Sequence, residues 1–309
     1  MDLRQLASLA AVADHRSFSA AARALHTVQS NVSSHVANLE RELEVVLVDR
    51  ATGSLTEEGR LVVERARRVQ VELDAVVADL AAHSGRISGT VLLGMIGTVG
   101  AWVLPLLIPA MAEGYPGIHL VVVDATTTSL TPQVVAGTLD AAVVNLPVTA
   151  PDLVSRPLFE EDRVVLAPPG HPLAVGDRKR IRLADLANHP LLLEPPGTAF
   201  RDDLDAAASR VGIELVPLAE VDGMRALAAL AQEGFGAAVL PSTAAPMAPA
   251  KGWRRIAITG LGPRTVGLVT SRRTRPSAPA RAVTEGVRAL LASEGPGRPG
   301  LRVLDQGDD

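Results

Sequence analysis

The chain has 309 residues, no cysteine and a formal net charge of -4. At about 150 residues per domain this length predicts two domains, and the absence of cysteine excludes disulfides, thiolate metal sites and a cysteine nucleophile. Hydrophobic residues make up 47% and charged residues 21%, so a large core is available and global disorder is excluded. Aromatic residues make up only 2%, which argues against a protein that stacks single-stranded bases. A pI near 6.0 argues against a nucleic-acid-binding protein that is basic over its whole surface, but it allows a small local surface that reads DNA.

The first residues give no sign of export or membrane insertion. Met1-Asp2-Leu3-Arg4 lacks the basic and then apolar regions of a secretory signal. The apolar stretch at residues 99–111 contains Pro105 and Pro109 and is shorter than the roughly 18 residues of a membrane span. We therefore expect a cytoplasmic protein that does not contact a membrane.

Residues 1–55 predict three short helices. Apolar residues recur at helical spacing from Leu3 to Ala13, and Ser17 is a suitable N-cap for the second helix. The third helix carries one apolar stripe with spacings of 4, 3 and 4. This stripe consists of Val32, Val36, Leu39 and Leu43. Two short helices, a turn and an amphipathic helix are the outline of a helix-turn-helix.

The side of the third helix opposite this stripe is polar and small. Serine and asparagine donate hydrogen bonds to phosphates or base edges, and short side chains let a helix enter the major groove. Gln29 suits a bidentate contact to adenine, and Arg50 suits a phosphate. The candidate DNA-binding residues are Ser17, Gln29, Ser30, Asn31, Ser33, Ser34, Asn38 and Arg50.

The charge of this region favours the alternative of a purely structural three-helix cap. Residues 1–55 contain five arginines and six acidic residues, a net charge of -1. DNA affinity depends on neutralising phosphates, although helix N-termini, backbone amides and dimerisation supply part of the deficit. Spacing and charge alone leave both interpretations open.

Residues 45–55, with Gly53 at a turn, predict a small β-hairpin or wing, and Thr56 then caps a long helix that runs to about residue 83. Apolar residues in this helix follow spacings of 4, 3, 4, 3 and 4, which is a heptad seam. A narrow seam favours pairing with a second copy, and packing on the same chain is the alternative. The expected dimerisation residues are Val62, Val69, Leu73, Val76 and Leu80.

A different pattern begins after a hinge-like segment at residues 84–89. Short apolar strands alternate with helices up to about residue 292, which predicts mostly parallel α/β sheets. The residues from 293 onward are rich in glycine, proline and aspartate, so we expect a flexible tail there.

Several motifs resemble those of LysR-type transcriptional regulators. In the N-terminal region they are Ser17-Phe18-Ser19-Ala20-Ala21-Ala22, Gln29-Ser30, Leu39-Glu40, Leu47-Val48-Asp49-Arg50 and Leu55-Thr56-Glu57-Glu58-Gly59. Farther along they are Leu104-Pro105, Tyr115-Pro116, Gly137-Thr138-Leu139-Asp140, His171-Pro172-Leu173-Ala174 and Gly234-Phe235-Gly236. The sequence departs from the family pattern at Ser30, Ser34 and Glu44, where the family usually has proline, arginine and glycine.

The resemblance implies an N-terminal all-α winged helix-turn-helix with a long linker helix, and a C-terminal two-lobed α/β effector domain like that of periplasmic binding proteins. The expected parts are a DNA-binding domain at 1–58, a linker and dimerisation helix with hinge at 59–88, an effector domain at 89–292 and a flexible tail at 293–309. Lobe I would comprise about 89–164 and 267–292, and lobe II about 165–266. The implied protein is a regulator, not an enzyme, and needs no cofactor. It binds double-stranded DNA as a homodimer or homotetramer, contacts RNA polymerase and responds to a small-molecule co-inducer of unknown identity.

Ligands of such α/β folds bind beyond the carboxyl ends of the strands, where hydroxyl and amide side chains follow several strands of this sequence. The glycine-rich loop at 94–100 opens a helix whose N-terminus favours an anion. The candidate effector-binding residues are Gly97, Thr98, Val99, Thr127, Ser129, Asn145, Thr198 and Phe200. The hydroxyl residues equally suit helix capping, and Arg201 suits either a carboxylate ligand or a surface ion pair.

Two other functions share some of these features. Gly94, Gly97 and Gly100, with Asp124 downstream, loosely match the dinucleotide loop of a dehydrogenase, but the spacing is GxxGxxG rather than GxGxxG. The seven histidines are scattered without metal-ligand spacing. A solute-binding protein of a transporter would have the same two lobes but needs export. The dehydrogenase interpretation leaves residues 1–83 unexplained, and the sequence shows no export signal for a solute-binding protein.

Overall fold

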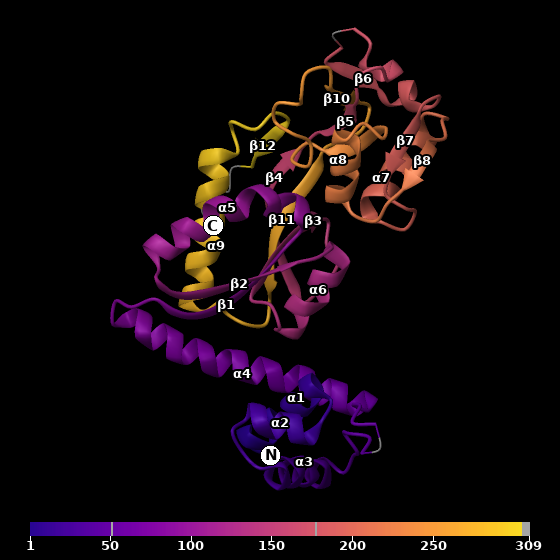
Figure 1. Ribbon diagram of the computed structural model, residues 1–309. Helices are drawn as coiled ribbons and strands as arrows, with labels where there is room; N and C mark the ends of the chain where they lie inside the picture. Colours follow the sequence, from indigo (N-terminus) through magenta and orange to yellow (C-terminus); the bar gives the residue numbers. More distant parts are fainter. Residues whose placement is uncertain (51, 177, 305–309) are drawn as a thin grey trace.

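The computed structural model describes residues 1–50, 52–176 and 178–304. A helical N-terminal domain lies at one end, the long helix α4 runs between it and the rest, and two α/β lobes follow one beyond the other (Figure 1).

Three short helices form the N-terminal domain: α1 (Leu3–His15), α2 (Phe18–Ala24) and α3 (Gln29–Leu43). The side chains of Asp2 and Ser17 cap α1 and α2 by accepting backbone N–H bonds. Three residues of the predicted stripe, Val32, Val36 and Leu39, are fully buried. They pack with Leu9, Val12, Ala21, Ala22, Leu47, Val48 and Val63.

A small wing follows α3. Its strands are reduced to one antiparallel bridge between Val48 and Leu55. The Glu40 carboxylate accepts the N–H groups of Leu47 at 2.9 Å and Val48 at 3.2 Å. A Cβ on Gly59 would lie 2.0 Å from the Leu47 oxygen, so only glycine lets the next helix approach the wing this closely.

Helix α4 (Glu57–His83) begins at Thr56, whose hydroxyl accepts the Gly59 N–H at 2.9 Å. It contacts α1 in the N-terminal domain and, in the part of the chain that follows, β1 (Ser88–Met95), α6 (Thr127–Ala136) and α9 (Ala278–Glu294). Among its buried residues, Val63 lies in the N-terminal core. The Asp79 carboxylate accepts the Ala278 N–H at 2.9 Å, which ties α4 to α9. The helix therefore joins the two halves of the protein as a packed element.

Lobe I is a six-stranded sheet in the order β12-β4-β11-β3-β1-β2. Strand β1 pairs in parallel with β2 and β3, and the other pairs are antiparallel. The strands are β1 (Ser88–Met95), β2 (Gly117–Asp124), β3 (Ala141–Leu146), β4 (Leu153–Glu161), β11 (Arg264–Ser271) and β12 (Leu301–Val303). The helices are α5 (Gly97–Gly114), α6 (Thr127–Ala136) and α9 (Ala278–Glu294).

Helix α5 has the length and apolar composition of a membrane span, which goes beyond the stretch expected at residues 99–111. Pro105 and Pro109 lie inside it without ending it. The helix packs against α9 and β2 and buries Val99, Val103 and Leu107 completely. It is the core helix of lobe I.

Lobe II is a second six-stranded sheet, in the order β6-β10-β5-β9-β7-β8. The strands are β5 (Arg163–Ala167), β6 (Arg180–Arg182), β7 (Pro190–Leu193), β8 (Val216–Glu220), β9 (Ala237–Pro241) and β10 (Arg254–Thr259). The helices are α7 (Ala199–Arg210) and α8 (Met224–Gln232), with 3-10 turns at Pro172–Ala174 and Leu183–Leu186. The chain enters lobe II at Asp162 and returns to lobe I at residues 260–263.

The expectation of a flexible tail from residue 293 is wrong for residues 293–304. Helix α9 continues to Glu294, the chain then turns back, and β12 pairs with β4 as an edge strand. The glycines and prolines that suggested disorder act here as turn residues, since Gly300 adopts a φ of +72°.

Candidate functional site

The polar face of α3 is exposed in the structure. Val32, Val36 and Leu39 point inward, whereas Gln29, Ser30, Asn31, Ser34 and Asn38 are exposed. Several of these side chains are held by local hydrogen bonds: Gln29 accepts from Ser19 at 2.8 Å, and Asn31 donates to Thr27 at 3.0 Å. Short polar groups held on an uncovered helix suit entry into a major groove.

Three of the predicted DNA-binding residues also have internal roles. Ser17 caps α2. Arg50 donates to Ser33 at 3.2 Å, pairs with Glu40 at 2.9 Å and lies over the Phe18 ring at 5.1 Å. The Arg50 side chain is still 46% exposed, so a phosphate could reach it from outside.

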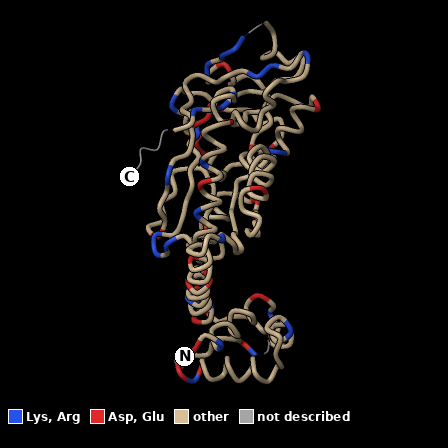
Figure 2. Tube along the Cα trace, turned by 90° about the vertical axis from the view of Figure 1, so that its left-hand side faces the viewer, with Lys and Arg blue, Asp and Glu red and all other residues tan. Residues whose placement is uncertain are grey.

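Glu40 is the centre of this small network. Burial alone would raise its pKa, but the N–H bonds from Leu47 and Val48 and the Arg50 guanidinium outweigh burial and lower the pKa of Glu40. The ionised carboxylate therefore fixes the wing on the C-terminal part of α3. Acidic and basic residues are mixed over this domain in Figure 2, which agrees with its small net charge.

The predicted seam of α4 divides into two parts. Val62, expected in the dimer seam, packs against the N-terminal core of its own chain. The alternative of packing on the same chain therefore applies to this residue. Val69, Leu73, Val76 and Leu80 are exposed apolar residues along the same helix. The neighbouring Val77 is also exposed. A row of exposed aliphatic side chains on a helix is typical of a surface that another helix covers.

A buried ion pair lies where the two lobes join. Arg264, the first residue of β11, donates through Nε to Glu161 at 2.9 Å and through Nη2 to Thr98 at 2.9 Å. The second Glu161 oxygen accepts the N–H of Thr243 from lobe II at 2.7 Å. All three side chains, Thr98, Glu161 and Arg264, are buried. The Thr98 hydroxyl, predicted to bind effector, is therefore already engaged by an arginine that the sequence did not single out.

Asp124 at the end of β2 and Arg225 on α8 form a second ion pair between the lobes. The pair covers Gly97 so closely that a Cβ there would lie 2.9 Å from Asp124 Oδ1 and 3.1 Å from Arg225 Nε. Gly97 begins α5, whose N-cap residue Ile96 makes no side-chain cap hydrogen bond. A carboxylate of the protein itself thus lies near the helix N-terminus where an anion was expected.

Thr127 and Asn145 come together at the carboxyl end of β3. The Thr127 hydroxyl accepts the Asn145 N–H at 3.0 Å. The side-chain oxygen of Asn145 is buried without a hydrogen-bond partner among the described residues. Nearby Ser129 belongs to the cap of α6, since its N–H and hydroxyl both bond to Thr126. An unsatisfied amide oxygen favours a ligand donor at this place.

Three other predicted effector residues are structural. Val99 is completely buried in the lobe I core, and Phe200 lies in the lobe II core under Arg163 at 5.2 Å, so core packing accounts for both side chains. Thr198 caps α7, where its hydroxyl accepts the Arg201 N–H at 3.3 Å. Arg201 is buried and pairs with Asp205 and Glu220, each at 2.8 Å, which leaves it neither a surface residue nor free for a carboxylate.

Glu194, missed in the sequence, is a polar group of lobe II close to the Arg264 charge. Its burial and the charge of Asp222 raise its pKa, although Thr198 and Arg264 act in the opposite direction. Two sequence signals could have indicated these residues. Glu161 and Arg264 lie next to the two segments where the chain crosses between the lobes, and Glu194 directly follows a strand. Glu161 and Arg264 are 103 positions apart in the sequence, so only the folded chain brings them together.

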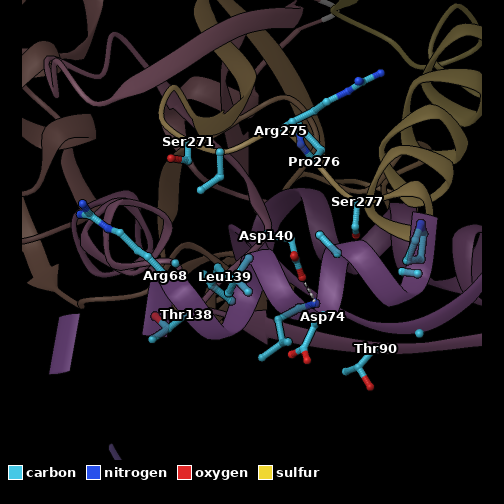
Figure 3. Close-up of a pocket in the computed structure, with 18 of the residues that line it drawn as sticks. Arg68, Asp74, Thr90, Thr138, Leu139, Asp140, Ser271, Arg275, Pro276 and Ser277 are labelled. Atoms are coloured by element: carbon cyan, nitrogen blue, oxygen red, sulfur yellow. Dashed lines mark hydrogen bonds between the residues drawn. The ribbon is translucent and has the colours of Figure 1, made fainter. Parts of the chain in front are cut away.

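A separate cavity of about 500 Å³ lies between α4 and lobe I. Figure 3 shows Asp140 and Asp74 in the same part of it, with Thr138 and Ser277 on its walls. Asp140 accepts the Leu92 N–H at 2.7 Å. Burial, together with the charge of Asp74, raises the pKa of Asp140 against this hydrogen bond.

Comparisons with known proteins match two regions of the chain. Residues 3–60 match a bacterial regulatory helix-turn-helix of the lysR family, and residues 84–292 match the LysR substrate binding domain. This chain belongs to the LysR family of transcriptional regulators. It is a DNA-binding regulator with an effector-binding domain, as the motifs predicted, and the expected fold class is confirmed.

Among its relatives, a probable hydrogen peroxide-inducible genes activator of Mycobacterium leprae is 33% identical and covers 94% of both chains. The dual regulator OxyR of Escherichia coli K12 is 30% identical over 94% of this chain and 96% of that one. The regulator also resembles two solved proteins. A full-length Pseudomonas aeruginosa OxyR with a cysteine-to-aspartate substitution has a TM-score of 0.76 at 25% identity, covering 94% of both chains. CbnR bound to its target DNA has a TM-score of 0.65 at 26% identity, covering 94% of this chain and 99% of that one.

The glycine-rich loop of the regulator has a packing explanation. A Cβ on Gly94 would lie 2.9 Å from side-chain atoms of Ala142, Leu130 and Leu139. Asp124, the acid that a ribose would need, is paired with Arg225. Within residues 1–50, 52–176 and 178–304, no three metal-ligating side chains come together.

Proposed function

We propose that the exposed face of α3 reads base edges in the major groove, through Gln29, Ser30, Asn31, Ser34 and Asn38. The observation that carries this proposal is the exposure of five amide and hydroxyl residues on one helix that also has a buried apolar stripe. Ser17, Ser33 and Arg50 lie beside this face and would contact or position phosphates. Paired copies would place two such helices in successive major grooves of an interrupted dyad.

The experiment is a mobility-shift assay with the intergenic DNA upstream of the gene that encodes this chain. Ser34→Glu places a carboxylate on the exposed face and should weaken specific binding by roughly tenfold or more, because one bad contact at a base or phosphate costs about 1–3 kcal/mol. Ser209→Glu makes the same change on an exposed position of α7, far from DNA. Equal operator affinity of both variants would contradict the proposed interface.

Pairing through the exposed α4 residues Val69, Leu73, Val76 and Leu80 would double the DNA contacts of each complex. This matters because residues 1–55 carry a net charge of -1 and contribute little long-range attraction to DNA. The proposed assembly is a homodimer that further associates to a homotetramer, acts in the cytoplasm, contacts RNA polymerase and carries out no catalysis.

For the effector, we propose a small polar molecule at the junction of the lobes. The unpaired Asn145 amide oxygen of lobe I and the half-buried Glu194 of lobe II support a ligand that donates hydrogen bonds. The ion pair between Asp124 and Arg225 would compete with a ligand carboxylate for Arg225. Such a ligand acts only if it binds one arrangement of the lobes more tightly than the other.

The chemistry of this response differs from thiol oxidation. Peroxide acts on regulatory proteins by oxidising a cysteine thiolate, and this chain has no cysteine. Binding without covalent chemistry is therefore the proposed signal. Thermal unfolding with a panel of amines, hydroxy acids and carboxylates tests it, and Asn145→Leu should abolish any stabilisation that a compound produces.

A further inference from the structure

Residues 295–304 form a segment that returns from α9 across the place where the two lobes join. The segment lies beyond the family match, which ends at residue 292. In Figure 1 it leads from the top of α9 to β12, next to β4 and beside lobe II. We call residues 295–304 the strap.

The strap is attached to lobe I by its second half and by one arginine. Strand β12 pairs with β4, so that Leu301 faces Glu161 and Val303 faces Phe159. The Leu304 N–H donates to Leu158 at 3.0 Å. Before the strand, the Arg298 guanidinium lies 4.0 Å from the centre of the Trp102 ring on α5.

The middle of the strap is attached to lobe II. The Pro299 carbonyl accepts from Ser242 Oγ and from Arg255 Nη2, both at 2.6 Å. Ser242 follows β9, and Arg255 lies on β10, so both donors belong to lobe II. The next carbonyl, on Gly300, accepts the N–H of Asp162 at 2.7 Å, and Asp162 is the residue at which the chain crosses between lobes.

The fit of the strap at this place depends on glycine. Gly300 has a φ of +72°, which L side chains rarely adopt. A Cβ at Gly300 would lie 2.5 Å from Ser242 Oγ and 3.2 Å from the Asp162 Cβ. A larger residue at this positive φ is strained and requires Ser242 Oγ, a donor to the strap, or the strap itself to move.

We propose that the strap restrains rotation of lobe II against lobe I. The lobes are joined covalently by crossings at Asp162 and at residues 260–263, and two neighbouring crossings form a hinge. A third connection, hydrogen-bonded to both lobes beside that hinge, raises the free energy of arrangements in which Ser242 and Arg255 move away from β12. The strap thereby sets how far the lobes turn, and a ligand that favours another lobe angle must break the two bonds to Pro299.

The experiment measures the distance between the lobes by pulsed electron resonance with two spin labels. Because the chain has no cysteine, Glu113→Cys on α5 and Arg210→Cys on α7 give labels on lobe I and lobe II without background. Both positions are exposed. The distance distribution is recorded in this doubly labelled protein, in the same protein with Gly300→Val, and with Gly297→Val as the matched control. A Cβ at Gly297 meets its nearest atom, the Glu294 oxygen, at 3.8 Å, so the control is accommodated.

Gly300→Val should broaden the distribution and displace its mean, while Gly297→Val should leave it as in the parent. Arg255→Gln, which removes one lobe II donor without steric conflict, should broaden it in the same direction to a smaller extent. Far-UV circular dichroism and thermal unfolding identify a variant that fails to fold, and Arg255→Gln then carries the test. A distribution that stays unchanged in folded Gly300→Val or, where that variant fails to fold, in Arg255→Gln would overturn the proposal.

Discussion

Asp124 of lobe I and Arg225 of lobe II form an ion pair of 2.6 Å across the junction between the lobes. Both side chains are more than one third exposed, so water and salt screen the attraction. The pair therefore contributes little to the stability of the fold. Because it lies close to the N-terminus of α5 and joins the two lobes, we expect it to influence how the lobes are held against each other.

Arg225→Gln should change the free energy of unfolding by less than about 1 kcal/mol, because exposed pairs contribute only this much. Hydrogen exchange at the start of α5 and of α8 should become faster, since the lobes lose a contact there. Arg182→Gln removes a comparable pair with Asp185 inside lobe II and serves as the control. Equal exchange in both variants would show that the pair does not hold the lobes together.

Glu40→Gln should loosen the wing. The carboxylate accepts the Leu47 and Val48 N–H groups and pairs with Arg50, and weakening such charge-assisted bonds costs about 1–3 kcal/mol. The pKa of Glu40 is lowered in the folded protein from its ordinary value of 4.5. Near and below pH 4.5 the unfolded chain therefore binds more protons at Glu40 than the folded protein does. The stabilisation is present at neutral pH and is lost as the pH falls through the lowered pKa of Glu40.

Unfolding of the parent and of Glu40→Gln at several pH values checks this sign. The difference between the two proteins should be largest at neutral pH and should shrink as the pH falls below the ordinary glutamate value. A constant difference down to strongly acidic pH would show that the charge of Glu40 is not what holds the wing.

Asp140→Asn should stabilise the protein at neutral pH. Burial and the Asp74 charge raise the pKa of Asp140 above 3.8, so the folded state holds its proton longer than the unfolded state. The folded protein therefore loses stability as the pH rises from 3.8, the ordinary aspartate pKa, through the raised pKa of Asp140 in the folded state. The asparagine keeps an oxygen for the Leu92 N–H but carries no charge. Thermal unfolding against pH should show a smaller loss in Asp140→Asn, and a lower melting temperature at every pH would contradict this account.

Leu80→Glu on α4 should separate the copies of the chain while leaving each copy folded. The side chain is 66% exposed, so its replacement should change the stability of one copy by no more than about 0.5 kcal/mol. Light scattering coupled to size exclusion measures the mass. Val175→Glu, at an equally exposed position of lobe II, is the control. A mass unchanged by Leu80→Glu would exclude this part of α4 from the interface.

Hydrogen peroxide should oxidise the exposed methionines before the buried ones. Met1 and Met247 are exposed, whereas Met95, Met111 and Met224 are buried. Peptide mass spectrometry should find sulfoxide first at the two exposed positions, and operator affinity should remain as it was because neither residue lies on the α3 face. A large change in DNA binding at low peroxide, reversed by methionine sulfoxide reductase, would show oxidative control through methionine.

The N-terminal region, residues 1–83, was predictable in detail because its signals are local. The spacing of Val32, Val36 and Leu39 determines which side of α3 is buried, and the cap residues Ser17 and Thr56 lie at the helix starts. The motif order from Ser17 to Gly59 likewise identified the family, because it requires only neighbouring residues.

For the effector domain, the sequence predicted only the outline of the fold. Alternating strands and helices indicated α/β lobes, but a hydroxyl after a strand has the same local signature whether it binds a ligand or caps a helix. Thr198 and Ser129 are caps, and Val99 and Phe200 are core residues. Which role applies depends on the partner that folding brings near.

The sequence by itself determined the family, the helix-turn-helix and the polar face of α3, since periodicity and short motifs are properties of adjacent residues. Only the tertiary structure decided that Arg264 reaches Thr98 and Glu161 and that residues 295–304 return across the hinge. Those contacts join positions far apart along the chain. Their geometry follows from the packing of two sheets, which no local pattern encodes.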